Sequence, residues 1–167
     1  MEICTGKISF HLHLNLYILQ SINIRLTSTA FQQNAFIPGK YSCEGENINP
    51  PLDIDHIPAG TKSFALVVDD PDAPKGTWVH WVVWNISPSK HLKENHIPGI
   101  EGINDFHQHH YGGPCPPSGT HRYFFKVYAL DTLLDLPGDT DKFKLEKMMH
   151  NHIIAVGELI GLYKRNS

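Results

Sequence analysis

Two apolar runs separated by a short polar segment constrain this chain more than any other feature of its sequence. Residues 64–68 and 78–86 are rich in β-branched and aromatic residues, and the segment between them contains the turn-forming sequence Asp69-Asp70-Pro71-Asp72-Ala73-Pro74-Lys75-Gly76. This pattern predicts two strands joined by a Pro/Asp/Gly connection. Because apolar residues occupy nearly every position of both runs, we expect both faces of these strands to be covered, as in the centre of a two-layer fold.

Three polar residues of this stretch have both a structural and a functional interpretation. Asp70 and Asp72 lie where the first run ends. His80 lies inside the second run, where strict alternation places it on one face with Trp78, Val82 and Trp84. Asp beside Pro is ordinary turn chemistry, and a histidine on an apolar face is most often a core residue with one hydrogen bond. In the functional interpretation, two carboxylates and an imidazole line a polar pocket at one end of a sheet. This stretch alone does not decide between the two.

A second informative stretch, residues 111–123, has the sequence YGGPCPPSGTHRY and runs into the aromatic segment 124–130. The aromatic and β-branched residues predict a strand, in which His121 and Tyr123 project from one face. The prolines pre-set the backbone of the preceding loop, and its glycines leave backbone N–H groups open to a ligand, an arrangement that favours anions. The alternative is a proline-rich turn before an aromatic strand.

Composition narrows the class of protein. With 167 residues, 13 Gly and 12 Pro, the chain fits one domain rich in turns, which favours β structure over a helix bundle. A net charge of −3 without a Lys/Arg cluster argues against nucleic-acid binding. No apolar run approaches the roughly 20 residues that a membrane-spanning helix needs. We expect a single domain over residues 22–167, preceded by an extension at 1–21 that forms either an extra strand or a poorly ordered leader.

The three cysteines, Cys4, Cys43 and Cys115, are odd in number and form no CxxC pair. This predicts the absence of a disulfide framework and therefore a reducing, cytoplasmic compartment, although a Cys43–Cys115 pair stays open. Cys115 could alternatively be an activated thiol beside a histidine, but a cysteine between prolines is more often simply packed.

The remaining segments predict peripheral elements. Residues 22–26 and 52–54 predict short strands, and residues 91–111 predict a long surface connection of the kind that walls a binding site. A helix is predicted from a cap at Asp139 or Thr140 to about residue 152, followed by a closing strand over residues 155–163. Its predicted buried face consists of Leu145, Met148, Met149 and His152.

Together, three segments resemble the phosphatidylethanolamine-binding protein family, most closely its bacterial branch of Raf-kinase-inhibitor-like proteins. They are Asp70-Pro71-Asp72-Ala73-Pro74, Trp78-Val79-His80-Trp81, and Gly113-Pro114-Cys115-Pro116-Pro117-Ser118-Gly119 with His121-Arg122-Tyr123. The resemblance covers residues 22–165. It implies a mainly β fold, a sandwich of two antiparallel sheets with Greek-key connections and a short helix near the C-terminus.

The resemblance also implies a small pocket that binds a phosphate-like anion or a phospholipid head group. Carried over residue by residue, the ligand-binding positions are Asp70, Asp72, His80, Pro116, Pro117, His121 and Tyr123, together with Cys115, which stands where many eukaryotic members have glycine. The family further implies a cis peptide, for which Ala73–Pro74 is the candidate. It implies no cofactor.

The residue chemistry agrees with a non-enzymatic binding site. Imidazoles and the Tyr123 hydroxyl can donate to phosphate oxygens, and the two aspartates can orient the histidines or meet a ligand ammonium. Ser118, His121 and Asp72 are triad residue types but lack the G-x-S-x-G elbow, so we do not expect a hydrolase.

Two further interpretations concern metals and partners. The histidines at 107, 109, 110, 150 and 152 lack the spacing of structural zinc ligands, so we expect no metal site. Alternatively, the chain is a protein-interaction or inhibitor module that regulates a kinase or protease, with the same pocket holding a phosphorylated or acidic side chain of the partner. The edge strands of a sandwich make a homodimer a further open alternative.

Overall fold

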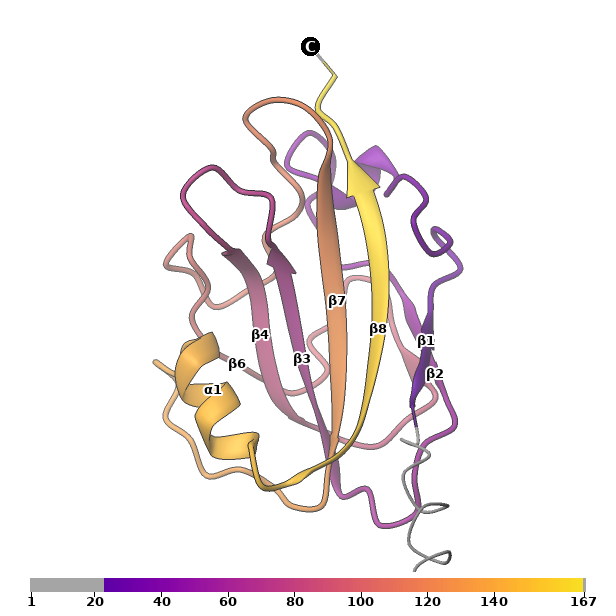
Figure 1. The fold of residues 1–167 in the computed structure, drawn as a ribbon, viewed down its shortest axis with the longest axis vertical. Coiled ribbons are helices and arrows are strands. Elements are labelled where there is room, and N and C mark those ends of the chain that lie inside the picture. The colour runs from indigo at the N-terminus through magenta and orange to yellow at the C-terminus, as the bar shows by residue number, and fades with distance from the viewer. Residues whose placement is uncertain (1–22, 167) are drawn as a thin grey trace, which may run out of the picture.

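A computed structural model describes residues 23–166, which form two antiparallel β-sheets and one short helix (Figure 1). The predicted extension at residues 1–21 lies outside the described residues. The small sheet has the order β1-β2-β5, with bounds β1 Arg25–Thr27, β2 Leu52–Asp55 and β5 His91–Leu92. The large sheet has the order β6-β4-β3-β7-β8, with bounds β6 Ile100–Glu101, β4 Trp78–Ile86, β3 Ser63–Asp70, β7 His121–Leu130 and β8 Ile153–Tyr163.

The large sheet contains the predicted Greek key. Strands β3, β4 and β6 follow one another in the sheet, and the chain then returns so that β7 pairs with β3 on its other side. All eight residues of β3 are buried, because β4 and β7 flank it and both of its faces are covered. The mainly β, two-sheet fold with a short C-terminal helix is therefore confirmed.

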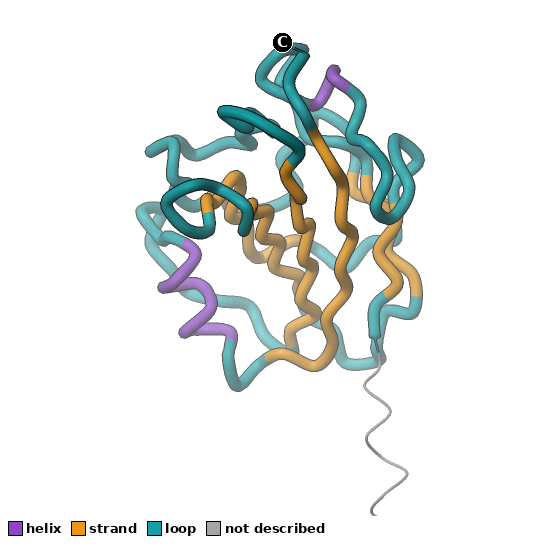
Figure 2. Tube along the Cα trace, turned by 45° about the horizontal axis from the view of Figure 1, so that its top comes forward, coloured by secondary structure: helices purple, strands orange, loops and turns teal. Residues whose placement is uncertain are grey.

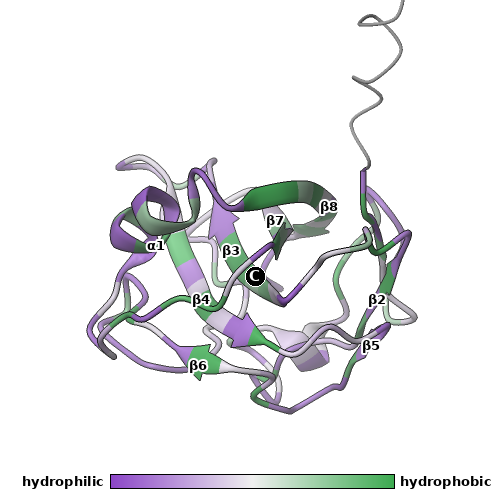
Figure 3. Ribbon diagram, turned by 90° about the horizontal axis from the view of Figure 1, so that it is seen from below, coloured by the Kyte–Doolittle hydropathy of each residue, from purple (hydrophilic) through white to green (hydrophobic). Residues whose placement is uncertain are grey.

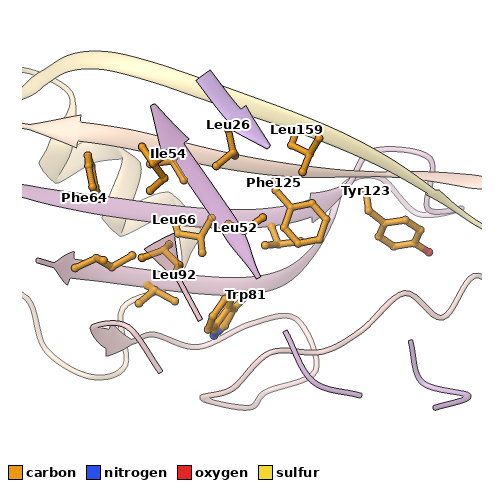
Figure 4. Packing of buried hydrophobic residues seen from close by; sticks show 14 of the residues in the cluster. Leu26, Leu52, Ile54, Phe64, Leu66, Trp81, Leu92, Tyr123, Phe125 and Leu159 are labelled. Carbon is orange, nitrogen blue, oxygen red and sulfur yellow. The ribbon is translucent and has the colours of Figure 1, made fainter. Parts of the chain in front are cut away.

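Two hydrophobic clusters hold these layers together. The larger lies between the two sheets and contains Leu52, Phe64, Trp81 and Phe125 (Figure 4). The smaller cluster lies on the other face of the large sheet, where helix α1 (Lys142–Met149) covers it with Leu145 and other apolar residues. Figure 3 shows α1 and the small sheet on opposite sides of the large sheet.

Helix α1 is shorter than predicted. Its N-cap is Asp141, whose Oδ1 accepts a hydrogen bond of 2.8 Å from Lys144 N, so neither Asp139 nor Thr140 caps it. The helix ends at Met149, and Met148, predicted as buried, is 47% exposed. In a helix of only two turns, a pair spaced by four residues, Leu145 and Met149, is enough to cover the sheet.

The loops gather at one end of the large sheet (Figure 2). Residues 91–111, predicted as one surface connection, also contain the short strands β5 and β6, which are too brief to leave a periodic signal. The segments before β4 and before β7, which carry the two sequence motifs, meet at this end, where the candidate site lies.

Candidate ligand-binding site

A β-bulge in β4 determines where His80 points. Val68 pairs with Trp81 and Asp69 pairs with Val79, so His80 has no partner across the ladder and the alternation of faces shifts at this residue. Val82 and Trp84 pack beneath α1, whereas the His80 ring lies 5.2 Å from the Tyr123 ring, between centroids. The prediction that His80 shares a face with Val82 and Trp84 is therefore wrong, because strict alternation does not foresee a bulge. Trp78, the third residue predicted on that face, lines a hollow together with His80.

Beside His80 lies a hollow of about 220 Å³ that opens at the loop end of the large sheet. Its walls come from the end of β3, the connection to β4 and the first residues of β4. The loop after β6, the loop before β7 and the first residues of β7 complete them. The hollow is lined by Asp70, Ala73, Pro74, Trp78, His80, Phe106, Cys115, Pro116, Pro117 and Tyr123. Six of the eight predicted residues are therefore in its wall.

His80 presents one ring nitrogen to the backbone and keeps the other unpaired. Its Nδ1 lies 2.6 Å from Gly112 O, so Nδ1 carries the hydrogen and donates it. Nε2 forms no hydrogen bond within residues 23–166. Burial lowers the pKa of His80 from 6.5, against the opposing influence of the Gly112 hydrogen bond and the Asp70 charge, so the free imidazole is mainly neutral at pH 7.

The Tyr123 hydroxyl has no hydrogen-bond partner within the part of the chain that the structure describes, although the residue is 0% exposed. Tyr123 is one of the residues that line the hollow. Burial, reinforced by the nearby charge of Asp70, raises the pKa of Tyr123 far above 10, so the hydroxyl keeps its proton. It therefore remains a donor, with no acceptor in hydrogen-bond geometry among the described residues and with the Asp70 carboxylate close by.

Asp70 and His121 form a buried pair behind this hydroxyl. His121 Nδ1 lies 2.7 Å from Asp70 Oδ2, and Asp70 Oδ1 accepts a hydrogen bond of 2.8 Å from Asp72 N. Asp70 lines the hollow, but His121 does not and lies one hydrogen bond behind it. The pairing of β7 with β3 and β8 places His121 there, so His121 acts on the hollow through Asp70.

Asp72 is not brought to the hollow. Its carboxylate accepts hydrogen bonds from Arg122 N, Nε and Nη2 at 3.0, 2.9 and 2.7 Å. The Arg122 guanidinium holds the pKa of Asp72 down at about 2. This exposed clamp ties the β3–β4 connection to the start of β7, so the structure gives Asp72 a positioning contact and no ligand-facing one.

Cys115 lines the hollow as half of a disulfide with Cys43. The Cys43–Cys115 pair, which the sequence left open, is therefore formed, although no disulfide framework was expected. The alternative of an activated Cys115 thiol is wrong, since the sulfur is already bonded. The expectation of a reducing, cytoplasmic compartment rested on unpaired cysteines, and the bond removes that basis because disulfides are typical of oxidising compartments.

The connection from β3 to β4 is closed without a cis peptide. Every peptide bond in residues 23–166 is trans, so the cis Ala73–Pro74 bond that the resemblance implied is contradicted. Instead, Gly76 N donates to Ala73 O at 3.1 Å, and Gly76 adopts a φ of +104°. Glycine reaches that conformation without a steric penalty, so the turn closes around it.

One wall of the hollow, the loop after β6, was not predicted from the sequence. Phe106 packs edge-on against His80 and Trp78, with ring centroids 5.3 and 5.5 Å apart. The buried Asn104 side chain holds this loop, because its Oδ1 accepts from Phe106 N and its Nδ2 donates to His80 O. The only sequence signal for this wall was the length of the connection over residues 91–111, and length does not show that Phe106 is the residue that reaches the hollow.

Residues 23–166 contain neither a metal-binding cluster nor a membrane-spanning helix. No group of three His, Cys, Asp or Glu side chains there is arranged to hold a metal ion. Nor is any helix in this region long and apolar enough to cross a membrane.

The sequence matches a known protein family over most of its length. The sequence model of one family, described as phosphatidylethanolamine-binding protein, matches residues 27–164. The chain belongs to this family. The resemblance drawn from the motifs is thereby confirmed.

Relatives of similar length occur in archaea and bacteria. UPF0098 protein PH1269 of Pyrococcus horikoshii is 49% identical over 151 residues, which cover 83% of this chain and 75% of that protein. The UPF0098 protein of Methanothermobacter thermautotrophicus is 45% identical over 150 residues, covering 85% and 99%.

Solved structures agree with the fold. A putative phosphatidylethanolamine-binding protein homologue from Chlamydia trachomatis is 42% identical with a TM-score of 0.83, over 87% of this chain and 100% of that one. YbcL of E. coli, described as a new member of the mammalian family, is 31% identical with a TM-score of 0.80, over 86% and 99%.

Proposed function

We propose that the chain is a non-enzymatic binding protein whose hollow takes a small phosphate-bearing head group of the phosphoethanolamine type. The observation that carries this is the Tyr123 hydroxyl, a buried donor without a partner among residues 23–166, on a side chain that lines the hollow. Leaving a buried hydroxyl unpaired costs about 1–3 kcal/mol. A ligand oxygen that accepts this hydrogen bond removes the cost, so the free site favours an acceptor.

The charges of the hollow favour a zwitterion over a bare anion. No Lys or Arg is among its lining residues, and Asp70 contributes a carboxylate. A phosphate would therefore depend on the Tyr123 hydroxyl and on a protonated His80, whose Nε2 then donates. A ligand ammonium would be attracted to the Asp70 carboxylate. The family is described as phosphatidylethanolamine-binding, and ethanolamine carries such an ammonium group.

Binding rather than catalysis fits the side chains at this end of the molecule. Cys115 is oxidised, and Ser118 forms no hydrogen bond to a histidine within the described chain. No nucleophile is thus paired with a base, which acyl transfer requires. A phosphorylated side chain of a protein presents the same oxygens as a head group, so it is the alternative ligand.

The test is calorimetric titration with glycerophosphoethanolamine and, as the second probe, a phosphoserine peptide. The variant Tyr123→Phe deletes only the hydroxyl. We expect its affinity for whichever probe binds wild type more tightly to fall by about tenfold or more, which is the value of a hydrogen bond to a charged group. Tyr128→Phe is the matched control, because Tyr128 lies on the opposite face of β7. Equal affinities for wild type and Tyr123→Phe, or no binding of either probe to wild type, would refute the proposal.

A further inference from the structure

A second cavity lies next to the hollow, between the loop before β7 and the chain that follows β8. In Figure 1 these two segments lie side by side at the end of the molecule that carries the C-terminus. The cavity has a volume of about 360 Å³ and is called the basic groove here. Its lining residues are Pro117, Ser118, Gly119, Lys164, Arg165 and Asn166. Pro117 also lines the hollow, so one residue separates the two cavities.

The walls of the basic groove present cations that are weakly engaged. Lys164 forms no ion pair with another described residue. Arg165 has a single distant partner, since its Nε lies 3.9 Å from Glu44 Oε1, and its side chain is 52% exposed. Both side chains are therefore available to an anion that enters the groove.

The loop side of the groove adds backbone donors. The N–H groups of Ser118 and Gly119 have no acceptor among residues 23–166. Gly119 has a φ of +71°, and the space where a side chain would begin is open. Successive amides in such a turn form a concave set of donors that binds anions.

The carboxylate of Glu44 lies near Arg165, outside the residues that line the groove, and already accepts two hydrogen bonds. Glu44 Oε2 accepts hydrogen bonds from Tyr163 Oη at 2.6 Å and from Asn166 N at 3.2 Å. These contacts lower the pKa of Glu44, so it stays ionised and balances one of the two cations. Among the described residues, Lys164, Arg165 and Glu44 together give the groove a net positive charge.

We propose that the basic groove binds a second anionic group of the same ligand whose head group occupies the hollow. This inference rests on the proposed function of the hollow. The ligand class is a small molecule with two phosphate or carboxylate groups on a short flexible linker that passes over Pro117. The proline-rich loop holds the two cavities at a fixed spacing, which lowers the entropy cost of binding both groups together.

The probes are butyl phosphate and butanediol bisphosphate, which differ only in the second phosphate. Affinities are measured by calorimetry at about 20 mM salt, where the charges are weakly screened. Wild type should bind the bisphosphate about 5- to 10-fold more tightly than the monophosphate, as expected for two exposed ionic contacts. The double variant Lys164→Ala, Arg165→Ala should reduce this ratio to about twofold or less while leaving the monophosphate affinity unchanged.

The control is the double variant Lys90→Ala, Lys147→Ala, which removes two exposed lysines that line neither cavity and should keep the full ratio. A wild-type ratio near one, or a ratio that survives in Lys164→Ala, Arg165→Ala, would overturn the inference.

Backbone amide NMR spectra separate this failure from a failure of the proposed function. A bisphosphate-induced shift at Gly119 that disappears in the Lys164→Ala, Arg165→Ala variant supports anion binding in the groove. If the Tyr123 amide responds neither to these probes nor to glycerophosphoethanolamine, the assignment of the hollow is wrong. If Tyr123 responds to both probes and Gly119 to neither, only the groove inference is wrong.

Discussion

The disulfide between Cys43 and Cys115 should contribute a large part of the stability of this protein. It joins residues 72 positions apart in sequence, so it removes much of the conformational freedom of the unfolded chain. For a loop of that length the chain-entropy relation gives about 4 kcal/mol. The native state should change little without the bond, because the same two loops are also joined by Cys43 N donating to Pro114 O and by Gly113 N donating to Asn47 Oδ1.

Urea unfolding of wild type and of the variant Cys43→Ser, Cys115→Ser measures this contribution. With a denaturant dependence of about 2 kcal/mol per molar, we expect the midpoint to fall by about 2 M. Cys4→Ser is the control, since it leaves the pair intact and should keep the wild-type midpoint. Equal midpoints for wild type and the Cys43/Cys115 variant, with the bond verified in wild type by mass spectrometry, would refute the entropy argument. Loss of the native circular dichroism signal would refute it differently, by showing that the bond is needed to form the native loops.

Two further predictions concern charge. An anion in the hollow favours a protonated His80, whose pKa is lowered from 6.5 by burial, so binding should take up a proton. The ligand affinity should therefore fall by up to about tenfold for each pH unit above that pKa. Glycerophosphoethanolamine keeps its phosphate charge between about pH 5 and 8, so its calorimetric affinity should rise as the pH falls in wild type. That rise should vanish in His80→Asn, which retains a donor for Gly112 and does not titrate; a pH-independent wild type would contradict this. Asp72→Asn should cost less than about 1 kcal/mol in urea unfolding at pH 7, because the Arg122 clamp is exposed, and the difference should vanish as the pH falls through about 2, the pKa that Arg122 imposes. The same variant should leave ligand affinity within about twofold, and a larger loss would mean that Asp72 faces the ligand.

The fold was predictable because its signals are local and repeated. The apolar runs that become β3 and β4, and the regular alternation that places His121 and Tyr123 on one face of β7, persist in the structure. A strand buried on both faces has little freedom in its sequence, so the centre of the sandwich could be identified from composition alone.

The details of the site depended on contacts between distant segments, which no local pattern records. The bulge at His80 arises from the register between β3 and β4, and Asp72 is drawn away from the hollow by Arg122, 50 positions along the chain. Phe106 reaches the hollow because Asn104 anchors its loop to the backbone of His80. The pairing of Cys43 with Cys115 likewise required the fold, since cysteine spacing alone leaves it open.

A crystal structure of the protein soaked with glycerophosphoethanolamine tests the central claim most directly. We expect a phosphate oxygen within about 2.5–3.0 Å of the Tyr123 hydroxyl, with the ammonium toward Asp70. Ligand density elsewhere on the surface, or a hollow that stays free of the ligand at saturating concentration, would contradict the account.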